Sequence, residues 1–346
     1  MKGFRIGNRL IGGDSDPVVI AEIGINHGGK LSVAKKLVDL AFSSGCEVVK
    51  HQTHFLTDEM TYKAKEIFPP NTNKSIWHVM EECALSKTDE IELKKYTEDL
   101  GMIYLSTPFS RKAADFLAEI DIPAFKIGSG ESDNIPLIKH VASFGKPVIL
   151  STGMQSINSL RSSVQILIDS NIDFALLECT NLYPSPPEIV SLAGILELQS
   201  AFDDALVGFS DHSIGPEMAL AAVAMGSCII ERHFTDTRYR SGPDISCSMD
   251  PSELKYLIER SKEIHIARNN KKIRSLPEEE VYRFARASVV ADRDLKAGIT
   301  ITENDIWVRR PGSGPIAAYD YYKLIGKTLI KGKNFNDFID WSDFKE

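Results

Sequence analysis

Two histidines and three acidic residues that could bind a metal or transfer protons follow apolar runs or lie in polar loops within one stretch of the sequence, residues 208–250. They are His212, His233, Asp211, Glu231 and Asp244. The two histidines lie where successive apolar runs end and polar loops begin. Two imidazoles at neighbouring strand ends could share a divalent cation and leave coordination positions open for substrate and water. The alternative is that they act as a general acid or as simple hydrogen-bond donors.

The acidic neighbours of the histidines also allow two interpretations. Asp211 and Glu231 could orient the imidazoles from behind, or they could form salt bridges within the fold. Asp244 lies in a Gly-Pro-Asp loop that could close over a pocket. There it could hold the hydroxyl groups of a polyhydroxylated substrate, or it could be an ordinary turn residue.

Two lysines end other apolar runs of the sequence. Lys50 and Lys126 would be buried at a high cost unless an anion meets each ammonium group. Hydroxyl side chains lie at the ends of further runs, and these are Thr107, Ser129, Ser151 and Ser210. Lysines and hydroxyls together predict a phosphate-binding cradle. The competing interpretation is a set of unrelated caps, and Glu22, taken alone, is typical of a structural carboxylate.

The pattern that must position these residues is an alternation of short apolar runs with amphipathic stretches. We expect strands at 18–21, 48–52, 103–106, 124–127, 148–151, 175–179, 206–209 and 228–231. Helical periodicity is expected at 32–42, 87–100, 110–120, 134–143, 156–169, 187–202, 216–225 and 251–268. Eight strands alternating with eight helices predict a closed parallel (β/α)8 TIM barrel, with residues at the strand ends forming the site. An open doubly wound sheet is the competitor, but no dinucleotide fingerprint follows the first strand.

Length and composition agree with a barrel and a second, smaller domain. The chain has 346 residues, of which 43% are hydrophobic and 25% charged. We expect a barrel domain over residues 1–268, a polar linker over 269–286, and a small β-rich domain over 287–346. Arg309 and Arg310 in this last part are by default a surface charge pair.

Charge and cysteine content exclude several classes of protein. A formal net charge of -8 argues against a nucleic-acid partner, because such proteins need a dense basic face. Five cysteines without a CxxC pair encode neither a disulfide framework nor a cysteine zinc site. We find no signal-peptide core and no run of about 18 apolar residues, so we expect a cytoplasmic protein with no membrane partner.

Nine motifs, in order along the chain, resemble those of the sialic acid synthase family. They are EIGINHGG, KHQTH, LSTPF, FKIGSGE, ILSTGM, CTNLYPSP, GFSDHS, ERHFTD and GPDI. From about Ala287 onward, SVVADRDLKAGITITENDIWVRRPG is similar to the antifreeze-like (SAF, β-clip) domain of that family. The resemblance covers nearly the whole chain.

The resemblance implies condensation of phosphoenolpyruvate with an N-acetylated amino sugar. The stretches HQTH and RSGPDISCSMD look closest to the N-acetylneuraminate synthase branch, in which the sugar is N-acetylmannosamine. The alternative within the family is a legionaminate or pseudaminate synthase that acts on a 2,4-diacetamido hexose. A more remote alternative is a non-catalytic sugar-acid binding protein that kept the fold.

The resemblance also implies a role for each matching residue. His212 and His233 match metal ligands, with Mn²⁺ the expected ion and Mg²⁺ or Co²⁺ the alternatives. Positions around phosphoenolpyruvate are matched by Lys50, Thr107, Lys126, Ser129, Ser151, Asn181 and Ser210. Positions around the sugar are matched by Glu22, Asn71, Tyr183 and Asp244.

Two further matches concern proton transfer and assembly. Glu131 matches the carboxylate assigned acid and base work, and Glu22 is the second candidate for the proton transfers. Arg310 matches an arginine that the C-terminal domain of one subunit inserts into the barrel of another. The resemblance therefore implies a domain-swapped homodimer.

Overall fold

The computed structural model describes residues 3–69 and 72–345. The chain divides into two compact units, the first ending at Asn269 and the second beginning at Asn270. None of the helices in these described ranges is long and apolar enough to cross a membrane.

The first unit is built on eight parallel strands that close into a barrel, as predicted. The strands are β3 (Val18–Gly24), β4 (Val48–Thr53), β5 (Ile103–Pro108), β6 (Phe125–Ile127), β7 (Val148–Ser151), β8 (Phe174–Cys179), β9 (Leu206–Asp211) and β10 (Ile229–His233). Their order around the barrel is β10-β3-β4-β5-β6-β7-β8-β9. The pairing of β10 with β3, in which His233 lies opposite Glu22, closes the ring and excludes the open sheet.

Strand residues are apolar almost throughout because both faces of the barrel wall are buried. In β3, Val18 and Ile20 belong to the core inside the barrel, whereas Val19 and Ala21 belong to the core between strands and helices. In β10, Ile229 faces inward and Ile230 outward in the same way. The side that a residue faces therefore follows from the period of two along each strand.

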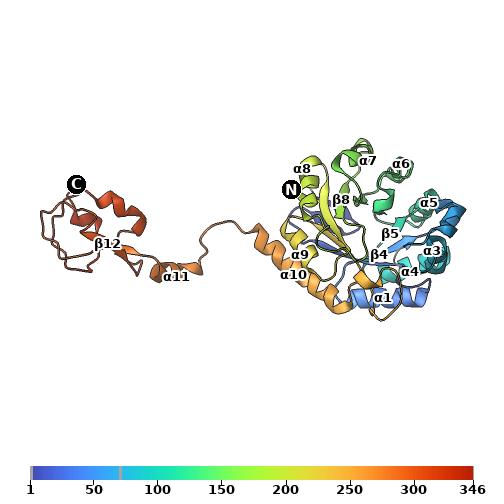
Figure 1. Ribbon diagram of the computed structural model, residues 1–346, viewed down its shortest axis with the longest axis horizontal. Coiled ribbons are helices and arrows are strands. Elements are labelled where there is room, and N and C mark those ends of the chain that lie inside the picture. Colours follow the sequence, from blue (N-terminus) through green and yellow to red (C-terminus); the bar gives the residue numbers. More distant parts are fainter. Residues whose placement is uncertain (1–2, 70–71, 346) are drawn as a thin grey trace. The chain divides into compact units, whose positions relative to one another are not determined.

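Helices surround the strands (Figure 1). They are α1 (Leu31–Ser43), α4 (Lys87–Asp99), α5 (Arg111–Glu119), α6 (Ile135–Ala142), α7 (Ile157–Asp169), α8 (Leu192–Ala201), α9 (Glu217–Ala224) and α10 (Pro251–Asn269). Most begin close to the predicted residue. The helix predicted at 187–202 was wrong at its start, because Ser191 caps α8 by accepting a hydrogen bond from the Gly194 amide.

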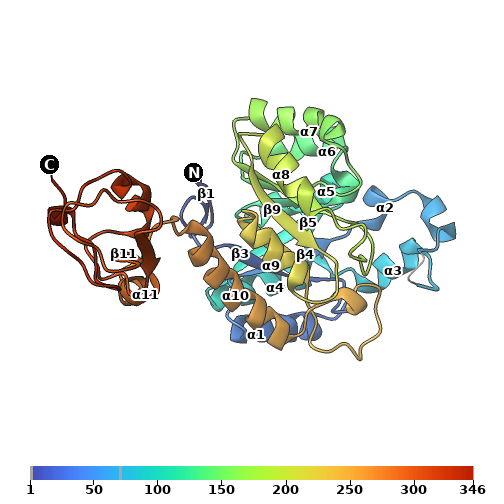
Figure 2. The same cartoon turned by 60° about the vertical axis from the view of Figure 1, so that its left-hand side comes forward.

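An N-terminal β-hairpin covers one end of the barrel and was not predicted. It consists of β1 (Gly3–Ile6) and β2 (Arg9–Gly12). Its side chains Phe4, Ile6 and Ile11 are buried in the core inside the barrel. Figure 2 shows β1 at one end of the barrel and the short helices α2 (Leu56–Glu59) and α3 (Ile76–Cys83) at the opposite end. The hairpin therefore closes the end from which the strands start.

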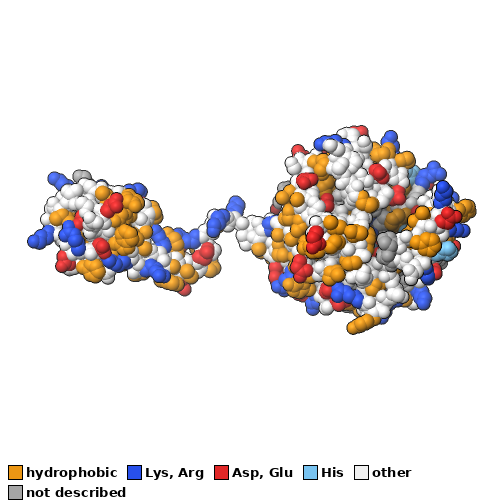
Figure 3. Space-filling view, viewed as in Figure 1, with side chains coloured by type: hydrophobic (Ala, Val, Ile, Leu, Met, Phe, Trp, Pro, Cys, Tyr) orange, Lys and Arg blue, Asp and Glu red, His pale blue; other side chains and the backbone are white. Residues whose placement is uncertain are grey.

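The second unit is small and β-rich, as predicted, and has a core of its own. It contains α11 (Glu278–Ala285), the antiparallel pair β11 (Ser288–Ala291) and β12 (Ile306–Arg309), and the 3₁₀ helices η4 (Ala318–Leu324) and η5 (Trp341–Asp343). Helix α11 occupies part of the stretch expected to be a linker. Basic and apolar side chains are interspersed on the surface of the second unit (Figure 3).

Candidate active site at the mouth of the barrel

A cavity of about 620 Å³ lies at the carboxyl ends of the barrel strands. Twelve of the side chains singled out in the sequence line it together: Glu22, Lys50, Thr107, Lys126, Ser129, Ser151, Asn181, Tyr183, Ser210, His212, His233 and Asp244. Catalytic residues of barrel enzymes are drawn from this end of the strands. The structure therefore brings the expected anion-binding, metal-binding and sugar-binding residues into one space.

Two lysines and two glutamates form a buried cluster in this cavity. The Lys50 ammonium contacts the Glu22 carboxylate, and Glu231 Oε1 lies 3.6 Å from Lys50 Nζ and 3.7 Å from Lys126 Nζ. Lys126 Nζ also donates to Ser151 Oγ at 2.7 Å. Glu231 is thus an ion-pair partner of the lysines, which was one of its two sequence interpretations.

Burial and charge act differently on the two lysines of this cluster. Burial lowers the pKa of Lys126, and Glu231 opposes that effect only in part. Burial also disfavours the charged form of Lys50, but Glu22 and Glu231 outweigh it and raise the Lys50 pKa. Lys126 is therefore the less well compensated cation, and an anion entering the cavity would stabilise its charged form.

The two histidines lie side by side, with their ring centroids 5.3 Å apart. His212 Nδ1 lies 2.8 Å from the carbonyl oxygen of Thr180, so Nε2 is the ring nitrogen left for a ligand. His233 Nδ1 is buried and has no hydrogen-bond partner among the described residues, and it lies 3.7 Å from the Asp244 carboxylate. Burial lowers the pKa of both imidazoles, which favours the neutral form that binds metals.

These donors fit a divalent cation with open coordination positions. Two neutral imidazoles would supply nitrogen ligands, and Asp244 adds a carboxylate at the same edge of the cavity. Across residues 3–69 and 72–345, no group of three or more histidine, cysteine or acidic side chains converges on one point. The arrangement resembles a catalytic site, which keeps positions for substrate and water, more than a closed structural site.

Part of the cavity lining is apolar. It is formed by Ile25, Ile76, Val79, Met80, Phe109 and Leu182. Three of these come from α3, which sequence reasoning missed, although the apolar spacing of 76–80 could have indicated a helix there. A lining with both apolar and polar side chains suits a ligand with both methyl and hydroxyl groups.

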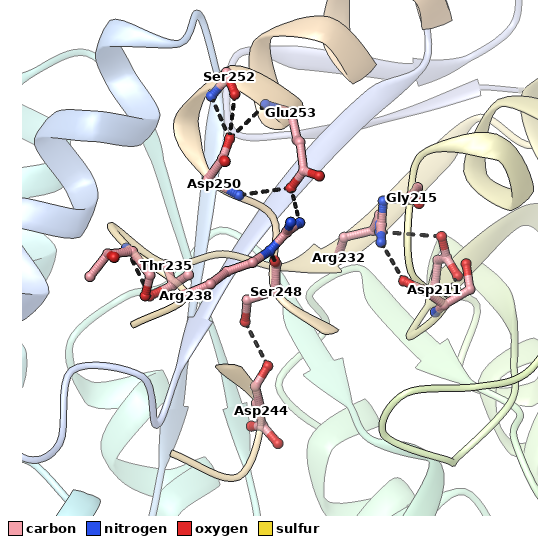
Figure 4. A network of polar contacts seen from close by, with 12 residues as sticks. Asp211, Gly215, Arg232, Thr235, Arg238, Asp244, Ser248, Asp250, Ser252 and Glu253 are labelled. Atoms are coloured by element: carbon pink, nitrogen blue, oxygen red, sulfur yellow. Dashed lines mark hydrogen bonds and ion pairs between the residues drawn. The ribbon is translucent and has the colours of Figure 1, made fainter. Parts of the chain in front are cut away.

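The loop that carries Asp244 is held by hydrogen bonds within the loop and by an ion pair to α10 (Figure 4). Ser248 Oγ donates to the Asp244 carbonyl oxygen at 2.7 Å, and Arg238 Nε donates to the Ser248 carbonyl oxygen at 3.2 Å. The Arg238 guanidinium also contacts Glu253 in α10. Burial raises the pKa of Asp244 to about 6.

Glu131 is not among the described residues that line the cavity. Glu131 accepts a hydrogen bond from the Asn134 side chain at the start of α6, and burial raises its pKa. Its neighbour Ser129 lines the cavity instead. Arg310 is exposed in the second unit, and Asn71 lies outside the described residues.

Strand alternation explains which polar residues of β4 reach the site. Gln52 lines the cavity, where its Nε2 donates to Glu22 Oε1 at 2.9 Å. His51 points the other way, with its Nδ1 3.4 Å from Glu90 in α4. Gln52 and Cys179 also line the cavity but were not among the predicted site residues. The period of two along each strand could have found both.

Comparison with known proteins agrees with the geometry. Residues 37–273 match the model of the NeuB family, and residues 286–345 match that of the SAF domain. N,N'-diacetyllegionaminic acid synthase of Campylobacter jejuni is 35% identical, over 93% of this chain and 98% of that protein. Human N-acetylneuraminate-9-phosphate synthase is 32% identical, over 96% of this chain and 93% of that protein.

Solved structures show the same likeness. The crystal structure of the N-acetylneuraminic acid synthetase of Leptospira borgpetersenii has 31% sequence identity and a TM-score of 0.73, over 81% of this chain and 95% of that one. The match to the family model spans more than half of the chain, and the relatives align along nearly their whole length. The chain is therefore a member of the NeuB family with a C-terminal SAF domain, a family whose relatives here are sugar-acid synthases.

Proposed function

We propose that this protein is an N-acetylneuraminate synthase, which condenses phosphoenolpyruvate with N-acetylmannosamine to give N-acetylneuraminate and phosphate. The observation that carries the proposal is the placement of a buried lysine pair and a histidine pair in one cavity. The lysines suit a substrate with several negative charges, and the histidines suit a cation that acts on an aldehyde. The names of the relatives support synthesis of a sugar acid.

Phosphoenolpyruvate would bind among the strand ends that carry lysines and hydroxyls. Lys50 Nζ donates to Thr107 Oγ1 at 3.0 Å, and Lys126 Nζ to Ser151 Oγ at 2.7 Å, so each ammonium is already oriented. The remaining binding positions are Ser129, Asn181 and Ser210, which line the same space. These residues would position phosphoenolpyruvate and stabilise its charge, and they would form no covalent bond to it.

His212 and His233 would hold the metal ion, for which we propose Mn²⁺, with Mg²⁺ and Co²⁺ as alternatives. The bound ion would supply Lewis-acid polarisation of the aldehyde of the open-chain sugar. Tyr183 and Asp244 would hold the sugar, because both line the cavity beside the histidines.

The reaction forms one carbon–carbon bond and replaces the bond from C2 to the phosphate oxygen with a bond from C2 to the oxygen of water. C3 of phosphoenolpyruvate attacks the aldehyde carbon, whose oxygen takes a proton. Water adds to the electron-poor C2 and gives up a proton, and the resulting adduct loses inorganic phosphate as the 2-keto group forms. We propose Glu22 as the carboxylate that accepts the proton from water, because it lines the cavity and Glu131 does not.

A 2,4-diacetamido sugar is the second candidate substrate. The apolar part of the lining, formed by α3, Phe109 and Leu182, would accept an additional acetamido methyl group. The legionaminic acid synthases of Campylobacter jejuni and Legionella pneumophila are 35% and 34% identical to this chain. Both observations are equally compatible with N-acetylmannosamine.

The experiment that tests the proposal is phosphate release from phosphoenolpyruvate against a panel of amino sugars. We expect release with N-acetylmannosamine and Mn²⁺, and loss of release when a chelator is added. Greater turnover with a diacetamido sugar would mean that this sugar, and not N-acetylmannosamine, is the substrate of the same condensation reaction. Absence of phosphate release with every sugar, with and without added Mn²⁺, would favour a non-catalytic binding protein.

We further propose a cytoplasmic homodimer in which Arg310 of one subunit completes the cavity of the other. Arg310 is exposed, and an additional cation would help to balance the charge of phosphoenolpyruvate. All five cysteines are free thiols, which suits a reducing compartment. Sedimentation of the full chain tests the dimer. Mixing an Arg310→Ala subunit with a Lys126→Met subunit should restore activity only if the sites are shared.

A further inference from the structure

Arg232 lies between Glu231 and His233 on β10 but faces the opposite side of the barrel wall. Glu231 and His233 line the cavity, whereas Arg232, like Ile230, lies on the outward face of the strand. Its side chain is only 3% exposed. A buried guanidinium is costly unless its N–H groups find partners, so its contacts define what it does.

The contacts of Arg232 all go to one turn, residues 211–215, which follows β9 (Figure 4). Nη2 donates to the Ser213 carbonyl oxygen and Nη1 to the Gly215 carbonyl oxygen, both at 2.5 Å. Nε lies 3.2 Å from Asp211 Oδ2, and Asp211 Oδ1 accepts a hydrogen bond from the Ser213 amide at 2.8 Å. The guanidinium thus contacts both ends of the turn, at Asp211 and at Gly215.

His212 lies within this turn, between Asp211 and Ser213. Its flanking residues Asp211 and Ser213 are both bound to Arg232, and its own ring is bound to the Thr180 carbonyl oxygen. Arg232 in turn is joined by a single peptide bond to His233. One side chain therefore connects the backbone that carries the first histidine to the backbone that carries the second.

We propose that Arg232 is a positioning residue that sets the separation of His212 and His233, and thereby the affinity of the site for a divalent cation. This inference rests on the proposed metal-binding role of the two histidines. The planar fork of arginine can hold two carbonyl oxygens and a carboxylate at once, which the single ammonium of lysine cannot do in the same geometry. Gly215, with φ of 84°, lets the turn present its carbonyl oxygen to the fork.

The test compares Arg232→Lys and Arg232→Met with the unaltered protein in Mn²⁺ binding. Binding is measured on the full chain without phosphoenolpyruvate or sugar, from the electron paramagnetic resonance signal of free Mn²⁺. Loss of a group that orients a metal ligand typically weakens affinity by about 10–100-fold, and we expect a rise of that size in the Kd. Turnover should recover at high Mn²⁺ concentration, because the ligands themselves remain.

A matched control separates positioning from general stabilisation. Arg268 in α10 also donates to a backbone carbonyl oxygen, at 2.9 Å, but its acceptor Val223 lies in α9 and not in the turn that carries His212. Arg268→Lys and Arg268→Met should leave the Kd for Mn²⁺ unchanged, even where they lower the melting temperature. If these variants weakened Mn²⁺ binding as much as the Arg232 variants do, the effect would be a general loss of stability and the inference would be wrong.

Further outcomes separate this inference from the proposed function. Should His212→Ala and His233→Ala bind Mn²⁺ like the unaltered protein, the metal site itself is misplaced. Should they lose binding while a folded Arg232→Lys keeps the original Kd, only the role of Arg232 is refuted. If Arg232→Met does not fold, Arg232→Lys and Asp211→Asn decide the question, because both keep a side chain of similar size.

Discussion

Replacing Glu231 by glutamine removes one negative charge from the cavity without changing the shape of the side chain. The glutamate is 5% exposed and faces two buried ammonium groups, at 3.6 Å and 3.7 Å. After the substitution, Glu22 is the one carboxylate that remains near the two lysines within this cluster. We expect Glu231→Gln to destabilise the barrel.

The size of the effect follows from the two distances. At an effective dielectric constant of about 20, each attraction contributes about 4.5 kcal/mol. Desolvation of the glutamate, several kcal/mol, and repulsion by Glu22 offset part of this. Removing one partner of a buried ion pair costs about 3–5 kcal/mol in measured cases, and we expect a loss of that size.

The assay is chemical denaturation followed by circular dichroism, since α1 to α10 lie in the barrel unit and dominate the helical signal. Inorganic phosphate provides a second measurement. Because the substitution leaves the lysines under-compensated, phosphate should raise the melting temperature of Glu231→Gln more than that of the unaltered protein.

Glu178→Gln is a control with the opposite expected sign. Burial without an ion pair among the described residues raises the pKa of Glu178 to about 7. For an acid whose folded pKa is raised from 4.5, stability is present at low pH and is lost as the pH rises through 7. Removing the charge should therefore stabilise the protein at pH 8.

Two results would refute this reasoning about the cluster. One is a free energy of unfolding for Glu231→Gln within about 1 kcal/mol of the original value, a change typical of ordinary substitutions. The other is an equal response of both proteins to phosphate.

Four other substitutions test the site and the fold. Glu22→Gln should lower kcat by about 10²–10⁴-fold if this carboxylate accepts the proton, while Glu131→Gln should retain most activity; the reverse result would return the role to Glu131. Glu90→Gln should lower the free energy of unfolding at pH 7 by about 2–3 kcal/mol. Burial disfavours ionisation of Glu90, but His51 and two hydroxyl groups outweigh it and lower its pKa, so the difference should shrink as the pH falls below 4.5; a constant difference would contradict this. Arg310→Ala should raise the KM for phosphoenolpyruvate, and an unchanged KM would exclude its proposed contact.

Sequence reasoning predicted the barrel because its signal is local. Strands buried on both faces are short apolar runs. The starts of helices are indicated by capping residues such as Ser86, Ser110 and Ser156. Polar residues at the strand ends, such as Asp211 and His233, still belong to the hydrogen-bonded ladder, which is why several strands extend beyond the apolar runs. The hairpin β1–β2 was not predicted because its two antiparallel strands lie outside the alternation of strands with helices from which the barrel was inferred.

The site was predictable in membership but not in its internal contacts. That Lys50 and Lys126 follow apolar runs can be read from the sequence, but their shared partner Glu231 depends on the barrel bringing distant strands together. The grip of Arg232 on the turn after β9 likewise depends on the pairing of β10 with β9. Glu131 was placed at a strand end by its motif, yet a hydrogen bond to Asn134 turns it toward α6.

The hairpin at the closed end of the barrel imposes an order of events during synthesis. Phe4 and Ile229 share the core inside the barrel, although roughly 220 residues separate them along the chain. At about 5–20 residues per second, a ribosome needs on the order of 10–40 seconds to synthesise the intervening residues. Until β10 is made, the core inside the barrel lacks the strand that closes it, so the apolar side chains of the hairpin are covered only by the strands already synthesised. A chaperone that shields this part of the nascent chain would therefore act before β10 emerges.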